Sequence, residues 1–72
     1  MIPTLYIIVP CYNEEKVLPV TSRMFSEKIG ALIGNGKISE ASKVLFVNDG
    51  SRDNTWKIIT ELTEKNSRFA GL

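Results

Sequence analysis

Residues 45–51, Leu-Phe-Val-Asn-Asp-Gly-Ser, constrain the fold more than any other stretch of this 72-residue chain. Three apolar, strand-favouring residues lead directly into a cluster of polar, turn-forming residues, and a helical pattern follows. A short apolar run bounded in this way is typical of a buried parallel strand. Asp49 then follows the carboxyl end of the strand, where ligands of open parallel sheets bind. Taken alone, an aspartate that only caps a helix or shapes a turn is an equally good interpretation.

A second stretch near the amino terminus has the same design. Residues 5–9, Leu-Tyr-Ile-Ile-Val, form an apolar run, and Pro10 and the polar cluster 11–15 follow it. Because Pro10 has no N–H group, we expect the first strand to stop before it. A right-handed crossover makes the two strands parallel. Their carboxyl ends then point the same way, so Glu14 and Asp49 can line one crevice.

A long amphipathic helix is predicted between the two strands. It should begin near Leu18, because Pro19 is tolerated only in a first turn. Asn13 is expected to act as a local cap at the helix start, and Gly-Asn-Gly at residues 34–36 should end the helix. The face predicted to pack on the sheet follows the i, i+4, i+7, i+8 spacing: Phe25, Ile29, Leu32 and Ile33.

A second helix is predicted over residues 54–66, with Asp53 as its cap. Trp56 lies beside the apolar face of this helix, and we expect it to shield the seam between helix and sheet. Residues 69–72 read as the beginning of a third strand. The apolar face of the second helix again has helical spacing: Thr55, Ile58, Ile59 and Leu62.

The predicted fold class is therefore α/β, with the order β-α-β-α-(β). This is the amino-terminal portion of an open parallel sheet. Parallel sheets are normally covered by helices on both faces, and this chain supplies at most three strands, so we expect an incomplete domain. Strand 5–9 should be an exposed edge of the sheet. Its unpaired backbone groups could then drive self-association.

Composition excludes several classes of function. The net charge is +1 and there is no basic stripe, which argues against nucleic-acid binding. Histidine is absent, so histidine metal sites and histidine bases are excluded. No apolar run is long enough to span a membrane, and no signal peptide is recognised. Cys11 is the only cysteine and is expected to be a small buried hydrophobe, which fits a reducing, cytoplasmic setting.

The two strand-end motifs together resemble a known family. The pair is Ile-Val-Pro-Cys-Tyr-Asn-Glu-Glu at residues 8–15 and Val-Asn-Asp-Gly-Ser-Arg-Asp-Asn-Thr at residues 47–55. It resembles the amino-terminal segment of family 2 glycosyltransferases with the GT-A fold. The branch that it resembles most transfers a sugar from a nucleotide-sugar to a polyprenyl phosphate, dolichyl or undecaprenyl. The resemblance covers essentially the whole chain.

The resemblance implies a nucleotide-binding half of a GT-A domain over residues 1–72. Pro10, Tyr12 and Glu14 would lie along the base and ribose, and Asp49 would accept a hydrogen bond from the edge of uracil or guanine. The implied partners are a UDP- or GDP-sugar donor and a polyprenyl-phosphate or glycan acceptor. The implied role is in cell wall or glycolipid biosynthesis, in a parent protein that is cytoplasmic or associated with the cytoplasmic face of a membrane.

Two departures limit what the resemblance implies. Many family members have two consecutive aspartates where this chain has Asn48 and Asp49, so only Asp49 can carry charge there. The family's Asp-x-Asp motif, which holds Mg²⁺ or Mn²⁺ on the diphosphate, is absent from the 72 residues. The metal ligands of the full-length enzyme are therefore expected outside this chain, and the chain alone is expected to be inactive.

A different class of function stays open from sequence alone. A small α/β module that binds a nucleotide or a partner, without transferase chemistry, would show the same alternation of strands and helices. Neither the Gly-x-Gly-x-x-Gly nor the Gly-x-x-x-x-Gly-Lys phosphate-binding motif occurs, which weakens the Rossmann and P-loop versions of this alternative.

Overall fold

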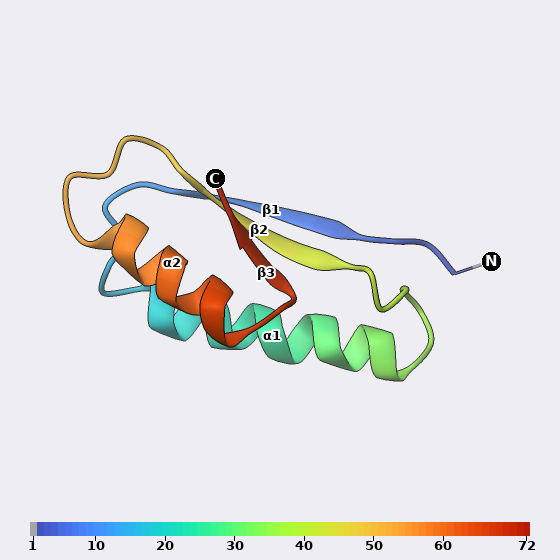
Figure 1. Ribbon diagram of the computed structural model, residues 1–72. Coiled ribbons are helices and arrows are strands. Elements are labelled where there is room, and N and C mark those ends of the chain that lie inside the picture. The colour runs from blue at the N-terminus through green and yellow to red at the C-terminus, as the bar shows by residue number, and fades with distance from the viewer. Residues whose placement is uncertain (1) are drawn as a thin grey trace.

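Two strand–helix units followed by a third strand make up the molecule (Figure 1). The computed structural model describes residues 2–72. All strands are parallel, in the spatial order β1-β2-β3. The predicted α/β class and the order β-α-β-α-β are thereby confirmed. The elements are β1 (Tyr6–Cys11), α1 (Leu18–Gly34), β2 (Lys43–Asn48), α2 (Thr55–Lys65) and β3 (Phe69–Gly71).

Strands β1 and β2 pair over their full length. Tyr6 lies opposite Lys43 at one end, and Cys11 lies opposite Asn48 at the other. The shorter β3 pairs with the middle of β2, from Val44 onward. Because β1 and β2 end at the same level, the loops that follow them leave the sheet at one edge.

The first strand continues through Pro10, where we expected it to stop. Pro10 lies opposite Val47, and Cys11 still belongs to the strand. Among residues 2–72, β1 has β2 as its single neighbour in the sheet, which confirms the predicted edge position. The carbonyl groups of Leu5 and Cys11 accept bonds from the β2 side, so Pro10, one residue out of step, faces the free side of the edge. Its missing N–H therefore removes no bond between the strands.

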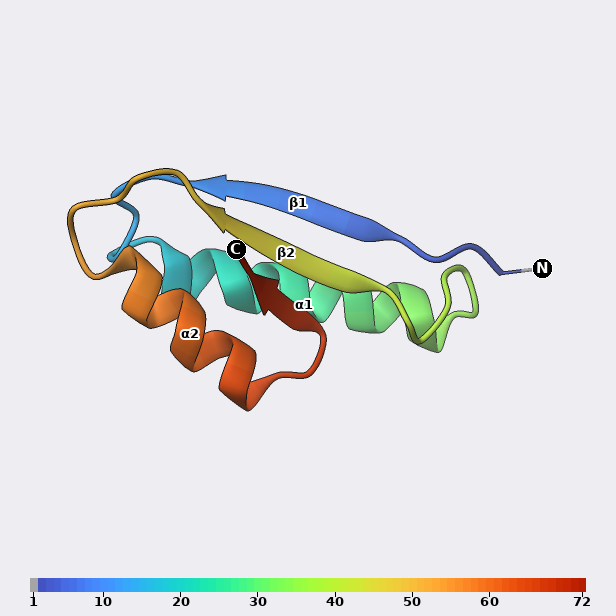
Figure 2. The same cartoon turned by 45° about the horizontal axis from the view of Figure 1, so that its top comes forward.

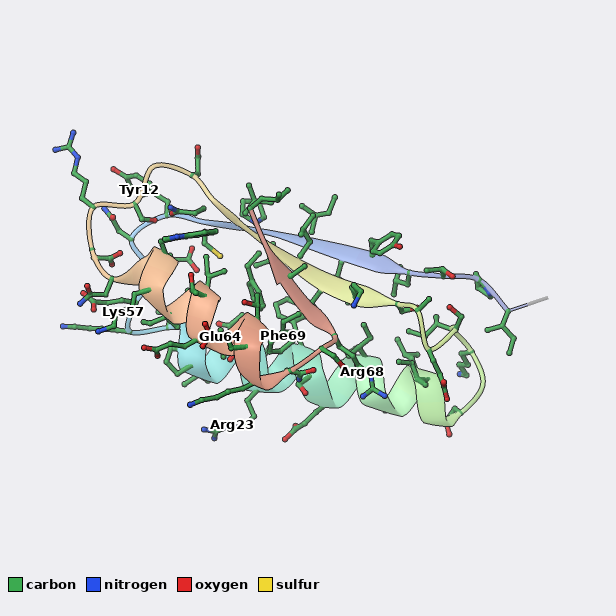
Figure 3. The ribbon with its side chains drawn as sticks, in the orientation of Figure 1. Tyr12, Arg23, Lys57, Glu64, Arg68 and Phe69 are labelled. Atoms are coloured by element: carbon green, nitrogen blue, oxygen red, sulfur yellow. The ribbon has the colours of Figure 1, made fainter. Side chains whose placement is uncertain are left out.

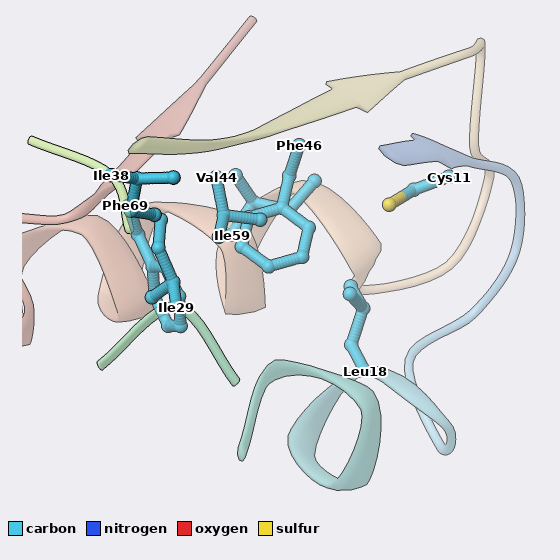
Figure 4. Packing of buried hydrophobic residues seen from close by; sticks show 8 residues of the cluster. All are labelled: Cys11, Leu18, Ile29, Ile38, Val44, Phe46, Ile59 and Phe69. Carbon is cyan, nitrogen blue, oxygen red and sulfur yellow. The ribbon is translucent and has the colours of Figure 1, made fainter. Parts of the chain in front are cut away.

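Both helices cover the same face of the sheet, as two views of the ribbon show (Figures 1 and 2). The buried hydrophobic core lies between them and the strands (Figure 4). Phe46 of β2 and Phe69 of β3 meet edge to face, with ring centroids 5.1 Å apart. Such pairs add to the stabilisation that burial alone gives. The core members are Cys11, Leu18, Ile29, Ile38, Val44, Phe46, Ile59 and Phe69.

The helix boundaries follow the predicted signals. α1 begins at Leu18, and it ends where the N–H groups of Gly36 and Lys37 bond carbonyl groups of its last turn. Gly36 has a φ of 70°, the left-handed conformation that glycine adopts at helix ends. α2 lies within the predicted range 54–66. Within residues 2–72, neither helix combines the length and the apolarity needed to cross a membrane.

Candidate functional site

Two loops at the carboxyl ends of β1 and β2 form the candidate site. The first loop comprises residues 12–17, and the second loop comprises residues 49–54. The backbone N–H of Asp49 donates to the carbonyl oxygen of Cys11 at 2.8 Å. This bond extends the pairing of the two strands into the loops. The sequence predicted this arrangement, because parallel neighbouring strands end at the same edge of a sheet.

The four predicted site residues all lie at or beside this edge. Pro10 and Asp49 are exposed, Tyr12 is 58% exposed, and Glu14 is half-buried. Figure 3 shows Tyr12 at the end of the molecule where the two loops lie. Residues 2–72 enclose no pocket around these side chains. The structure therefore places the four residues around an open edge, with their side chains accessible from solvent.

Glu14 and Asp49 are held by their backbones and not by their carboxylates. The N–H of Glu14 donates to Thr55 Oγ1 at 2.8 Å, and that of Asp49 donates to Cys11. Within residues 2–72 neither carboxylate accepts a hydrogen bond. Both carboxylates therefore keep their full capacity to accept hydrogen bonds from a ligand, as a base or ribose would require.

Asn13 joins the first loop to the second. Its backbone N–H donates to Ser51 Oγ at 2.9 Å, and its side-chain Oδ1 accepts the N–H of Arg52 at 2.8 Å. Asn13 has a φ of 49°, a left-handed conformation that asparagine tolerates better than most residues. We expected Asn13 to cap α1, and this was wrong. Val17 occupies the cap position and makes no side-chain cap bond.

Asp53 and Thr55 make a second connection between the loops. Asp53 Oδ2 accepts the N–H of Glu15 at 3.3 Å, and its Oδ1 accepts the N–H of Thr55 at 2.9 Å. The Thr55 hydroxyl also donates to Asp53, and Thr55 is fully buried. We expected Asp53 to be the cap of α2, but Asn54, the next residue, occupies the cap position. The Asp53 carboxylate still bonds the N–H of Thr55 in the first turn. The link to Glu15 was not predicted.

Two titratable groups near the loops have shifted pKa values. The hydrogen bond from the Thr55 hydroxyl is the main cause that lowers the pKa of the Asp53 carboxyl, and backbone N–H groups add to it. Burial raises the pKa of the Cys11 thiol, and the charge of Glu14 raises it further. Cys11 is fully buried, which confirms its prediction as a buried hydrophobe.

Asn48 has a structural role at the end of β2. Its Oδ1 accepts the N–H of Ser51 at 3.2 Å, which closes the turn through Gly50. Gly50 has a φ of 70°, where a side chain would be strained. An uncharged amide serves this purpose as well as a carboxylate does. The loss of a second aspartate at position 48 is therefore compatible with the geometry of the second loop.

Comparison with known proteins identifies the family that carries this pair of loops. Residues 6–71 match the model for glycosyl transferase family 2, so the match spans both loops and all three strands. The chain belongs to glycosyl transferase family 2. The resemblance of the two strand-end motifs is thereby confirmed.

Two glycosyltransferases have sequences similar to this chain. The uncharacterized glycosyltransferase YkoT of Bacillus subtilis (strain 168) is 46% identical over 70 residues, which is 97% of this chain and 21% of the relative. The UDP-N-acetylglucosamine–dolichyl-phosphate N-acetylglucosaminyltransferase of Methanococcus voltae is 36% identical over 58 residues, which is 81% of this chain and 19% of the relative. The chain thus spans about a fifth of the length of either relative.

The family's divalent metal site does not fit the described part of the chain. Within residues 2–72, no three side chains of His, Cys, Asp or Glu lie close enough to hold a metal ion together. Asp49 and Asp53 are both in the second loop, but Asp53 is committed to Glu15 and Thr55. A hard cation such as Mg²⁺ needs several free oxygen ligands, and this site does not provide them.

Proposed function

We propose that residues 1–72 are the nucleotide-binding half of a family 2 glycosyltransferase domain. The enzyme would transfer a sugar from a UDP- or GDP-sugar to an acceptor, with a polyprenyl phosphate preferred over a glycan. The observation that carries this proposal is the meeting of the two loops at one edge of the sheet, with free carboxylates on both. The name of the Methanococcus voltae relative, which specifies UDP-N-acetylglucosamine and dolichyl phosphate, supports the choice of donor and acceptor.

Each site residue has a role that its position allows. Asp49 would accept a hydrogen bond from an N–H group on the edge of the uracil or guanine base. The exposed ring of Tyr12 would flank the base, since aromatic faces stack on nucleobases. Pro10 and Glu14 would lie along the base and ribose, where the free carboxylate of Glu14 can accept a hydrogen bond from a ribose hydroxyl.

The chemistry of sugar transfer requires residues beyond this segment. We propose that Mg²⁺ or Mn²⁺ binds to ligands outside the 72 residues and that these residues alone do not catalyse transfer. When bound, the metal would neutralise the charge that develops on the leaving diphosphate. The cytoplasmic location, the membrane association of the parent protein and the role in cell wall or glycolipid biosynthesis stay predictions.

Calorimetric titration of the full-length natural protein with UDP and with GDP, each with Mn²⁺, tests the proposal. We expect one nucleotide to bind and Asp49→Ala to lose most of that affinity, which would also identify the base. Glu40→Ala removes an exposed carboxylate on the loop between α1 and β2 and serves as the matched control. Its affinity should equal that of the unchanged protein.

Two results would contradict the proposal. If a folded protein bound neither nucleotide, a binding module of another kind would be the better account of the chain. If Asp49→Ala and Glu40→Ala weakened binding equally, the nucleotide would bind elsewhere and the assignment of the loop edge would be wrong.

A further inference from the structure

The structure assigns a positioning role to four polar residues that join the two loops: Asn13, Ser51, Asp53 and Thr55. We call this set the loop clamp. None of its members is among the residues that we expect to touch the nucleotide. The inference rests on the proposed function, and it goes beyond it by stating what holds the binding residues in place.

The clamp residues and the binding residues divide their bonds differently. Tyr12, Glu14 and Asp49 make no side-chain hydrogen bond within residues 2–72. The clamp residues, which lie close to them in sequence, differ in this respect. Each clamp side chain makes a hydrogen bond to the opposite loop. If neither the binding side chains nor the loop backbones were held by hydrogen bonds, the loops would have to become ordered each time a ligand binds. That ordering would cost binding free energy.

Asn13 and Ser51 form the outer half of the clamp. The left-handed turn at Asn13 directs both its N–H and its side chain at the second loop. Ser51 Oγ accepts that N–H, and the hydroxyl lies 3.5 Å from the carbonyl oxygen of Cys11, to which it donates. These contacts fix the distance of Asn13, next to Tyr12, from Ser51 and Arg52 on the second loop.

Asp53 and Thr55 form the inner half of the clamp. The fully buried Thr55 hydroxyl accepts the N–H of Glu14, and Asp53 accepts the N–H of Glu15. Asp53 directly precedes the cap of α2, and Thr55 is its first residue. The first loop is therefore hydrogen-bonded to the amino-terminal end of α2 as well as to the second loop. The exposed pair of Asn54 Nδ2 and the Glu15 carboxylate, 3.2 Å apart, adds one more contact.

This arrangement predicts that clamp variants weaken nucleotide binding without unfolding the protein. Ser51→Ala and Asn13→Gly each remove one neutral hydrogen bond between the loops, and both leave every binding side chain in place. A net loss of one such bond corresponds to about a fivefold change in an equilibrium constant. The outer half is the better place to test this, because Asn13 is exposed and lies outside the hydrophobic core.

Titration of the full-length natural protein with the nucleotide that binds it, in the presence of Mn²⁺, tests the role. Ser51→Ala and Asn13→Gly should each bind about fivefold more weakly, and Ser51→Thr, which keeps the hydroxyl, should recover the affinity. Asn13→Gly retains the left-handed backbone and removes only the side-chain acceptor. Ser67→Ala and Asn35→Gly, at exposed positions away from both loops, are the matched controls.

Hydrogen exchange measured by mass spectrometry on the same proteins separates positioning from global stability. Exchange should become faster in peptides covering residues 12–17 and 49–54, while peptides from β2 and α1 keep their protection. Unchanged affinity in Ser51→Ala and Asn13→Gly would overturn the positioning role, whatever the exchange shows. So would an equal loss of affinity in the control variants. If the unchanged protein bound neither nucleotide, the proposed function itself would fail, and the clamp would have no ligand to serve.

Discussion

The two faces of the sheet are built from the same strands and have opposite surroundings. On the face covered by α1 and α2, Val44 and Phe46 of β2 are completely buried. On the other face, Tyr6 and Ile8 of β1 are 61% and 63% exposed. Both faces carry apolar side chains. Only the position of the helices decides which of these side chains stabilise the fold of residues 2–72.

The difference shows why apolar runs in parallel strands are informative about the complete sheet. An alternating pattern predicts a strand with one wet face, whereas residues 5–9 and 45–47 are continuously apolar. The sequence is thus that of strands buried on both faces. The described residues bury one face only, in keeping with a chain that spans about a fifth of its relatives.

The largest expected effect compares one side chain from each face. Phe46→Ala removes a fully buried ring that packs on Phe69, and it should lower the free energy of unfolding of the 72-residue chain by about 3–5 kcal/mol. Ile8→Ala, on the uncovered face, should change it by less than about 0.5 kcal/mol. Urea denaturation followed by circular dichroism measures both. Equal effects would mean that the two faces are buried alike.

A smaller effect is expected where β3 meets α2 on the covered face. A Cβ atom at Gly71 would lie 2.5 Å from Ile59 Cγ2, a stiff, buried methyl group. Gly71→Ala should therefore destabilise the chain by about 1–3 kcal/mol. Gly34→Ala is the matched control, because a Cβ there meets nothing within 4 Å. It should leave stability unchanged or raise it slightly, by less than about 1 kcal/mol. If Gly71→Ala were neutral in the same urea titration, the close packing at β3 would be disproved.

Much of the fold could be predicted because its signals are local. Pro19 and Gly36 act through the conformation of their own backbone, and they set the ends of α1 close to where they were expected. Ile38 was missed as a core residue. A single apolar residue in a polar loop is not part of a periodic pattern, so the sequence does not indicate that it is buried. The end of β1 was missed although its edge position was predicted, because the missing N–H of Pro10 was taken to end the strand without regard to the side of the strand on which it lies.

The candidate site divides along the same line. The placement of Glu14 and Asp49 on neighbouring loops at one edge of the sheet followed from parallel strand order alone. The bonds of Asn13 could not be predicted in this way, because its partner Arg52 lies 39 residues away in sequence. Helix-cap patterns relate a residue only to the next three residues in sequence. On that basis Asn13 was predicted to cap α1. The unbroken polar run at residues 51–55, directly before a helix, was the one available hint of the clamp.

The uncovered face and the free edge of β1 should promote self-association of the isolated 72-residue chain. We expect concentration-dependent association, measured by size-exclusion chromatography with light scattering. Ile8→Lys places a charge on that face and should shift the chain toward monomer. Val20→Lys introduces the same charge at a 60% exposed position of α1 and should leave association unchanged. A folded, unchanged chain that is monomeric at all concentrations would contradict the prediction.

The smallest expected effect concerns pH and lies at the loop edge, beyond both faces. The folded pKa of Asp53 is lowered from its ordinary value of 3.8, mainly by the Thr55 hydroxyl. A depressed folded pKa means that the ionised carboxylate stabilises the fold above pH 3.8 and that this contribution is lost as pH falls through the lower folded value. Asp53→Asn should therefore flatten the fall in melting temperature below pH 4, relative to the unchanged chain. Glu27→Gln, an exposed change on α1, is the control. If both variants followed the same curve as the unchanged chain, ionisation of Asp53 would contribute nothing, and its bonds to Glu15 and Thr55 would be equally strong when the carboxyl is protonated.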